Sequence, residues 1–185
     1  CARGVRSFKG FMAYKKRGMY LSDRDLLRIL ATLKDNGGLF CVHAENGDLC
    51  DYLEAGFAAA GKTGPEYYAP SRPGITEAEA AFRILSFAKV LDCPMYIVHV
   101  STQATLDVVD MFRKWNAAPI FVETCTHYLT LTNEDTLRLG TLAKVSPPLR
   151  EKDDVDALWQ AIIAGKIDVI GSDTAGHMLK SKEPR

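Results

Sequence analysis

The chain has 185 residues, of which 47% are hydrophobic and 25% are charged, and its 23 Lys and Arg residues balance its 23 Asp and Glu residues. This composition is typical of a folded globular domain and excludes disordered and collagen-like chains. The balanced charge gives no electrostatic reason to expect nucleic acid or an anionic membrane as a partner, because both attract a clustered positive surface. A small-molecule partner is therefore predicted.

Several features of the sequence indicate where the protein works. No apolar run approaches the roughly 20 residues of a membrane span, and no secretory leader pattern opens the chain. The five cysteines are an odd number without Cys-x-x-Cys spacing, which is typical of reduced thiols. We expect a soluble, cytoplasmic protein. Because the chain begins at Cys1 and ends outside any expected element, we also expect it to be a piece of a longer chain.

Short apolar runs alternate with amphipathic segments from the start of the chain. A strand is predicted over residues 7–12, and a capping box at Ser22 predicts a helix that ends at the glycine pair 37–38. A second strand is predicted over residues 39–43. The loop that we expect over residues 62–75 is long enough to suggest a functional role or a subunit contact.

The same alternation continues through the second half. Three helices are predicted: one from a capping box at Thr76 through Val90, one capped by Ser101 and running to Trp115, and one capped by Asp153 or Asp154 and running through Ala164. Three strands are predicted between and after them, over residues 95–99, 119–124 and 167–173.

This order of elements predicts an α/β fold with a parallel sheet. A complete (β/α)8 TIM barrel takes about 250 residues, so five βα units would form an incomplete barrel. An open doubly wound sheet would need a Gly-rich phosphate-binding turn after its first strand, and none is present. Residues 1–185 are predicted to form one partial barrel domain, since no internal repeat or linker divides them.

Four polar residues lie within or at the end of predicted strands: Lys9, His43, His99 and Asp173. An α/β barrel gathers its active site at the carboxyl ends of its strands, so these residues are expected to lie together. A single histidine there is more often structural, but four candidates favour a site. Imidazole and carboxylate groups bind zinc and similar ions, which suggests a hydrolytic metal site. A desolvated, neutral lysine can also react with carbon dioxide to form a carbamate.

Six motifs extend from the start of the chain to Asp173 and occur in a fixed order: SFKGFMAY at 7–14, VHAENG at 42–47, TGPE at 63–66 followed by SRP at 71–73, IVHVS at 97–101, SPPLR at 146–150 and GSD at 171–173. Together they resemble the successive motifs of the dihydropyrimidinase and hydantoinase branch of the cyclic amidohydrolases. The resemblance implies a metal-dependent (β/α)8 barrel, of which this chain would hold strands four to eight.

The resemblance also implies a binuclear metal centre. Lys9 matches the family's carboxylated lysine, whose carbamate bridges two divalent metal ions, expected to be zinc. His43 and His99 match the histidines on one metal. Asp173 matches the aspartate that binds the other metal and shuttles the catalytic proton.

Two further residues match the family's substrate-binding positions. Tyr14 matches the tyrosine that donates to the substrate carbonyl oxygen, and Ser146 matches the residue whose main chain holds the cyclic imide. The implied reaction opens a hydantoin or dihydropyrimidine ring to an N-carbamoyl amino acid. The implied assembly is a homotetramer.

The sequence departs from the family pattern in one respect. It contains no His-x-His pair, and the family's first barrel strands and small β-sandwich domain are also missing. We attribute these differences to truncation, and we expect the 185-residue chain alone to be inactive. Allantoinase or dihydroorotase activity remains an alternative, although those relatives carry His-x-Pro after the last aspartate, where this chain has Thr-Ala-Gly-His177. A non-catalytic, hydantoinase-like scaffold is the other alternative.

Other polar residues near the predicted strand ends have less specific interpretations. Glu45 and Asn46 are candidates for orienting the metal ligands. His127 is expected to pack or to form a supporting hydrogen bond, and His177 either contacts substrate or is solvated. No histidine is positioned by the sequence to activate Cys125, so we do not expect a thiol nucleophile.

Overall fold

The computed structural model describes residues 3–115 and 118–176. Five parallel strands form one sheet in sequence order. The strands are β1 Ser7–Phe11, β2 Leu39–His43, β3 Met95–Ile97, β4 Ile120–Cys125 and β5 Val169–Gly171. Each predicted strand is therefore confirmed, with ends that differ by a few residues.

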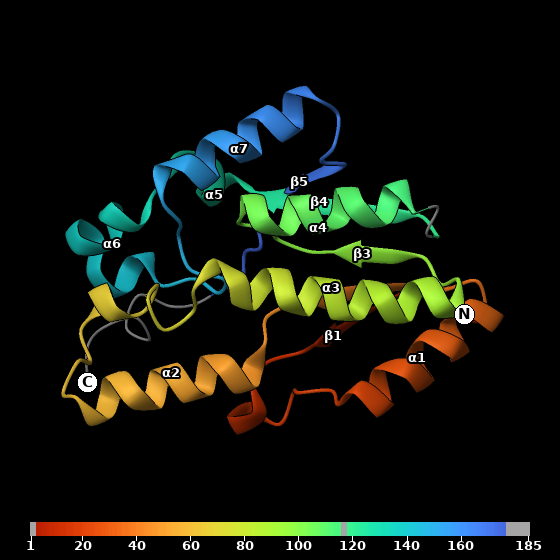
Figure 1. Ribbon diagram of the computed structural model, residues 1–185, viewed down its shortest axis with the longest axis horizontal. Helices are drawn as coiled ribbons and strands as arrows, with labels where there is room; N and C mark the ends of the chain where they lie inside the picture. The colour runs from red at the N-terminus through yellow and green to blue at the C-terminus, as the bar shows by residue number, and fades with distance from the viewer. Residues whose placement is uncertain (1–2, 116–117, 177–185) are drawn as a thin grey trace.

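The helices alternate with the strands, and some lie along the sheet while others lie beyond the carboxyl ends of the strands. The helices are α1 Asp23–Asp35, α2 Gly47–Ala59, α3 Gly74–Leu91, α4 Gln103–Lys114, α5 Thr126–Thr130, α6 Asn133–Leu139 and α7 Lys152–Ile163, with 3-10 turns η1 Lys15–Arg17, η2 Pro65–Tyr67 and η3 Gly140–Ala143. Figure 1 shows α1, α3, α4 and α7 side by side along the sheet, whereas α2 and α6 extend beyond the carboxyl ends of the strands.

This arrangement supports the predicted fold class. A doubly wound sheet carries helices on both faces, whereas a (β/α)8 barrel carries them only on the outside. Here consecutive βα units place their long helices along one face of a parallel sheet, as in an arc of a barrel. No helix in the described part of the chain is both long and apolar enough to cross a membrane.

The strand register separates the two faces of the sheet. Lys9 is paired with Cys41, Cys41 with Tyr96, and Tyr96 with Phe121, so these four side chains share one level and one face. They are all partly or fully exposed. This face corresponds to the interior of a barrel, and the described residues leave it open.

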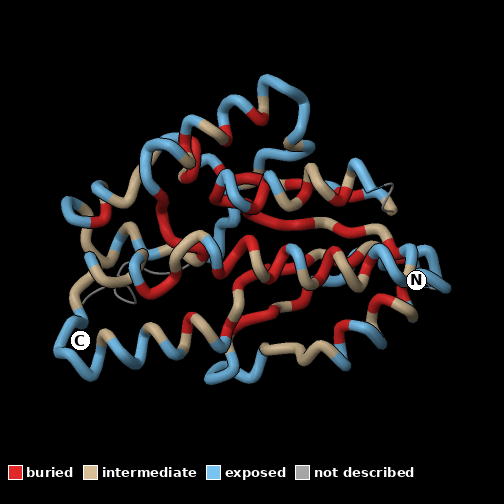
Figure 2. Tube along the Cα trace, viewed as in Figure 1, coloured by how far each residue is buried: buried red, intermediate tan, exposed pale blue. Residues whose placement is uncertain are grey.

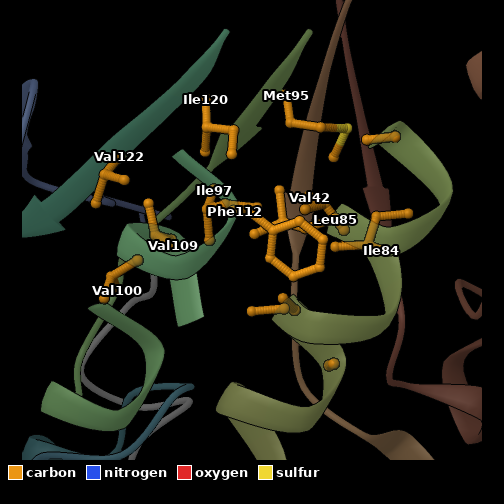
Figure 3. Packing of buried hydrophobic residues seen from close by; sticks show 14 of the residues in the cluster. Val42, Ile84, Leu85, Met95, Ile97, Val100, Val109, Phe112, Ile120 and Val122 are labelled. Atoms are coloured by element: carbon orange, nitrogen blue, oxygen red, sulfur yellow. The ribbon is translucent and has the colours of Figure 1, made fainter. Parts of the chain in front are cut away.

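The opposite face of the sheet forms the hydrophobic core. Its buried residues run along the strands and the facing sides of the helices, as the red segments in Figure 2 show. In Figure 3, apolar side chains of β2, β3 and β4 meet those of α3 and α4, and the labelled contacts involve Val42, Met95, Ile97, Ile120, Val122, Ile84, Leu85, Val109 and Phe112. Packing against these helices therefore fixes the position of the three central strands.

The helix starts show where the predictions hold. The capping box at Ser22 is confirmed, because its side chain accepts from the amide of Asp25 while Asp25 accepts from the amide of Ser22. The capping box predicted at Thr76 is wrong. Helix α3 begins at Gly74 with Pro73 as its N-cap, and the buried Thr76 hydroxyl donates to the Pro73 carbonyl oxygen. The fixed φ of proline already suits this helix entry.

Two other predicted caps are displaced. The N-cap of α4 is Thr102, whose hydroxyl accepts from the amide of Thr105, whereas Ser101 is used elsewhere. Helix α7 has Glu151 at its N-cap, and Asp154 instead accepts a 2.8 Å hydrogen bond from the amide of Gln103. A carboxylate of α7 thus satisfies a free amide at the start of α4.

The sequence patterns did not identify α2, α5 or α6. Helix α2 has a weak apolar stripe, and α5 and α6 are only five and seven residues long, too short for a periodic pattern. The loop predicted over residues 62–75 contains η2 and the first residues of α3. Strand β3 ends at Ile97, before the predicted residue 99, because His99 adopts a positive φ of 43°.

Candidate functional site

The carboxyl ends of the strands hold the predicted site residues. Tyr14 follows β1, His43 ends β2, His99 follows β3 and Asp173 follows β5. Among the described residues, only four other than glycine have a positive φ, and three of them are Tyr14, His99 and Asp173, at 69°, 43° and 44°. Left-handed backbone is costly for such residues and is concentrated at functional sites. The backbone therefore marks the same edge that the sequence predicts.

The two histidines form the center of this site. Both side chains are 2% exposed, and the Nδ1 atom of His43 lies 2.9 Å from the Nε2 atom of His99. Two imidazole nitrogens on one tetrahedral zinc ion, with Zn–N distances of about 2.0–2.1 Å, lie about 3.3 Å apart. The observed pair is therefore arranged so that both nitrogens can bind one metal ion.

The electrostatic surroundings keep this pair suitable as ligands. Burial, reinforced by the neighbouring His43 and Lys9 side chains, holds the pKa of His99 well below its usual value. His99 is therefore neutral at neutral pH, as a metal ligand must be.

The structure does not complete the metal coordination. Within residues 3–115 and 118–176, no three His, Cys, Asp or Glu side chains converge as a metal site would require. Lys9 is exposed on the open face of the sheet, and its Nζ atom lies 5.5 Å from the centre of the Phe11 ring. The positive charge of Lys9 also opposes the rise that burial causes in the pKa of Cys125. Asp173 is also exposed. The fold thus brings the two histidines into contact, whereas Lys9 and Asp173 do not converge with them into one cluster of ligands among the described residues.

Tyr14 and Ser146 lie beside the histidine pair. The ring of Tyr14 is centred 4.8 Å from that of His43. Burial, followed by the nearby charge of Glu45, raises the pKa of Tyr14, so its hydroxyl stays protonated and can donate. The Ser146 hydroxyl forms a hydrogen bond with the hydroxyl of Tyr68. The Ser146 hydroxyl also lies close enough to Tyr14 to lower the pKa of Tyr14 against the effect of burial.

A buried ion pair supports His43. The carboxylate of Glu45 is fully buried, and its Oε2 atom lies 2.7 Å from His43 Nε2 and accepts a 3.0 Å hydrogen bond from Arg72. Burial opposes ionisation of Glu45, but the hydrogen bond with His43 and the positive charge of Arg72 hold its pKa below the usual value. The sequence indicated Glu45 as a supporting residue, whereas Arg72 appeared only as part of a motif.

A second buried ion pair lies nearby and was not predicted. Glu77 accepts hydrogen bonds from the amide and hydroxyl of Ser101 at 3.0 Å and 2.5 Å. Arg150 donates to the Ser101 hydroxyl at 2.9 Å and to the carbonyl oxygen of Arg72 at 2.5 Å. The four residues are between 0% and 7% exposed. This network joins α3 to the loops that hold Arg72, Ser101 and Arg150.

The remaining candidates have mainly structural contacts. Asn46 is the N-cap of α2, where its side chain accepts a 3.0 Å hydrogen bond from the amide of Leu49 and donates a 2.7 Å hydrogen bond to Glu79. The buried Nε2 atom of His127 has no hydrogen-bond partner, and its ring packs on Tyr128. Burial raises the pKa of Cys125 to about 12, which is consistent with the absence of a thiol nucleophile. His177 lies outside the described residues.

Comparison with known proteins relates the whole chain to one group. No family model matches the chain. A D-hydantoinase from Ralstonia pickettii is 43% identical over 185 residues, which cover 98% of this chain and 40% of that protein. The solved structure of a D-hydantoinase from Bacillus sp. AR9 is 35% identical, with a TM-score of 0.92 over 97% of this chain and 40% of that one.

A more distant structure supports the fold alone. A dihydroorotase from Campylobacter jejuni has a TM-score of 0.67 at 17% identity, over 95% of this chain and 46% of that one. The chain spans about two-fifths of the length of the curated relatives that it matches.

Proposed function

The chain is homologous to the hydantoinase and dihydropyrimidinase branch of the cyclic amidohydrolases, and on this premise we propose that its protein opens a cyclic amide ring by hydrolysis. The substrates are a hydantoin or a dihydropyrimidine, and the product is an N-carbamoyl amino acid. The observation that carries the proposal is the contact between His43 and His99, because the two buried nitrogens are spaced for one metal ion.

The donor set determines which metal centre we propose. His43 and His99 would hold one ion, while a carbamate on Lys9 and the carboxylate of Asp173 would complete a centre with two ions, most simply zinc. Such ions supply a hydroxide near neutral pH by lowering the pKa of a water molecule. The open face beside Lys9 leaves room for a carbamate on its side chain.

The residues of this chain account for the proton transfers and for substrate orientation. Asp173 takes the proton of the attacking water on a carboxylate oxygen and returns it to the ring nitrogen as the carbon–nitrogen bond breaks. Tyr14 donates its hydroxyl hydrogen to the carbonyl oxygen, where negative charge develops. Its raised pKa keeps this hydrogen in place. The Ser146 main chain binds the imide edge of the ring.

The same relationship leads us to propose a cytoplasmic homotetramer whose partner is the cyclic amide substrate. It also leads us to propose that residues 1–185 are one part of a barrel domain and that they are inactive on their own. Sedimentation of the full-length protein measures the number of subunits in the assembly directly.

The activity test uses that same gene-encoded protein, purified with its metal. Ring opening is followed with hydantoin, dihydrouracil, allantoin and dihydroorotate, and metal content is measured on the same sample. We expect kcat/KM to be highest for hydantoin or dihydrouracil, and removal of metal by a chelator to abolish turnover. A preference for allantoin or dihydroorotate would assign the alternative activities. Full metal content without turnover of any of the four would contradict the proposed reaction.

A further inference from the structure

The two ring nitrogens of His43 have different partners. Nδ1 lies 2.9 Å from His99, and Nε2 lies 2.7 Å from the Oε2 atom of Glu45. A carboxylate accepts hydrogen bonds but does not donate them, so the hydrogen of the neutral ring belongs on Nε2. The lone pair is then on Nδ1, the atom that faces His99.

Glu45 is itself held in one position. Arg72 donates a 3.0 Å hydrogen bond to the same Oε2 atom, while the buried Oε1 atom has no hydrogen-bond partner. The Glu45 side chain is 0% exposed and that of Arg72 is 9% exposed, so water cannot replace either partner at low cost. All of the hydrogen bonds to this carboxylate therefore meet at the oxygen that faces His43.

Arg72 also reaches the substrate side of the site. Its guanidinium carbon lies 5.8 Å from the ring center of Tyr14 and 5.5 Å from that of Tyr68. Both distances are within the range of a cation–π contact. One side chain thus contacts both the carboxylate behind His43 and the ring of Tyr14.

We propose that Glu45 and Arg72 are a pair of positioning residues, in which Glu45 fixes the tautomer and ring orientation of His43, and Arg72 holds Glu45 and the Tyr14 ring together. The consequence for metal binding rests on the proposed function, whereas the consequence for the tautomer of His43 does not. Carboxylates that orient metal-binding histidines affect metal affinity about 10- to 100-fold.

The control for this proposal is a second ion pair, which reaches the first through a hydrogen bond from Arg150 to the main-chain carbonyl oxygen of Arg72. Glu77 and Arg150 form a second buried ion pair, and Glu77 bonds to Ser101 where Glu45 bonds to a histidine. Replacing both members of a buried ion pair with methionine avoids leaving an unpaired charge, so both double variants are expected to fold.

The experiment uses the gene-encoded protein labelled with ¹⁵N-histidine. Ring nitrogen chemical shifts are recorded without metal, with His43→Gln identifying the His43 signals, and zinc dissociation constants are measured by competition with a chelator. We expect the wild type to show the Nε2–H tautomer. Glu45→Gln should keep this tautomer, because its amide oxygen can still accept. Glu45→Met/Arg72→Met should show mixed tautomers and bind zinc about 10- to 100-fold more weakly. Glu77→Met/Arg150→Met should keep both the tautomer and the zinc affinity.

Two results would overturn the positioning role. One is a Glu45→Met/Arg72→Met variant with the wild-type tautomer and zinc affinity. The other is an equal loss of zinc affinity in both double variants, which would assign a general effect on stability. A wild type that binds no zinc would instead refute the proposed metal centre, and the tautomer measurement would still decide whether Glu45 positions His43.

Discussion

Lys9 is exposed, as Asp173 is, whereas His43 and His99 are buried. Its position on the open face, paired with Cys41 in the sheet, places it at the level of the barrel interior. A carbamate on Lys9 would therefore project into the space that the strands surround in a complete barrel. In the proposed centre the lysine would supply a carbamate there, and any carboxylate of similar reach would serve the same purpose.

Lys9→Ala should therefore lose metal and activity together in the gene-encoded protein, and short-chain carboxylic acids should partly restore both. The carboxylate of the added acid would occupy the space that the lysine side chain leaves. Metal content and hydantoin turnover are measured with and without added acetate or propionate. Unchanged metal content in Lys9→Ala would exclude the bridging role.

Tyr14→Phe should reduce kcat by about 10²- to 10³-fold, because it removes one donor to the developing oxyanion. Burial raises the pKa of Tyr14, so the hydroxyl keeps its hydrogen at neutral pH and its removal takes away a donor. Metal content should stay at the wild-type value. Near-normal turnover would show that Tyr14 serves only to pack against His43.

The sequence allowed part of the site to be predicted. His43, His99 and Asp173 were identifiable because each follows an apolar strand run, and strand ends gather in this type of fold. Arg72 was not identifiable as the partner of Glu45, because the two residues are 27 positions apart and meet only when the loop before α3 folds back. No local pattern in a sequence encodes such a contact.

At the scale of elements, the strands were predictable because each is a compact apolar run between turn residues. The helix starts of α3 and α4 were less predictable, since several Ser, Thr and Asp residues lie close together and any of them can cap. Tertiary contacts made the choice. Ser101 is bound by Glu77 and Arg150, which leaves Thr102 as the cap of α4.

Helix α2 approaches the loop after β1 very closely at Gly47. A Cβ atom there would lie 2.8 Å from the Cα of Ala13 and 3.0 Å from the carbonyl oxygen of Met12, and the Gly47 amide donates to that same oxygen. No side chain fits without a shift of backbone. Because Tyr14 follows Ala13 directly, such a shift would move a proposed catalytic group.

Gly47→Ala should therefore destabilise the protein by about 1–3 kcal/mol and also lower kcat. Gly56→Ala is the matched control, because it lies on the same helix with no atom within 4 Å of its new Cβ. That change should stabilise the protein by about 0.5–1 kcal/mol. Chemical unfolding and turnover are measured for both. Wild-type kcat in Gly47→Ala would show that the loop adapts without moving Tyr14.

At the scale of the whole molecule, the sheet ends on both sides in strands with one neighbour each. The edge strands are β1 and β5, and Phe8, Val169 and Ile170 on them are 38%, 39% and 50% exposed. Unpaired strand edges with exposed apolar residues favour pairing with other chains. The fold class was predictable from the alternation of elements, but that alternation does not predict what pairs with these two edges.

A polypeptide of residues 1–185 alone should consequently aggregate or unfold, and it should not hydrolyse hydantoin. Sedimentation, thermal unfolding and activity of the expressed polypeptide test this expectation. A monomer that melts cooperatively would show that the open edges are tolerated, and turnover of substrate would show that the described residues hold a complete site.

Helix α4 is attached at both ends to the unit formed by α7 and β5. Its first amide, at Gln103, is bound by Asp154 of α7, and near its end Arg113 donates to the carbonyl oxygen of Lys166 and to Asp168 just before β5. A local opening that releases α7 would therefore expose the first turn of α4 as well. Helix α4, helix α7 and strand β5 should therefore open as one cooperative unit in native-state hydrogen exchange. The slowest amides of the three elements should show matching opening free energies.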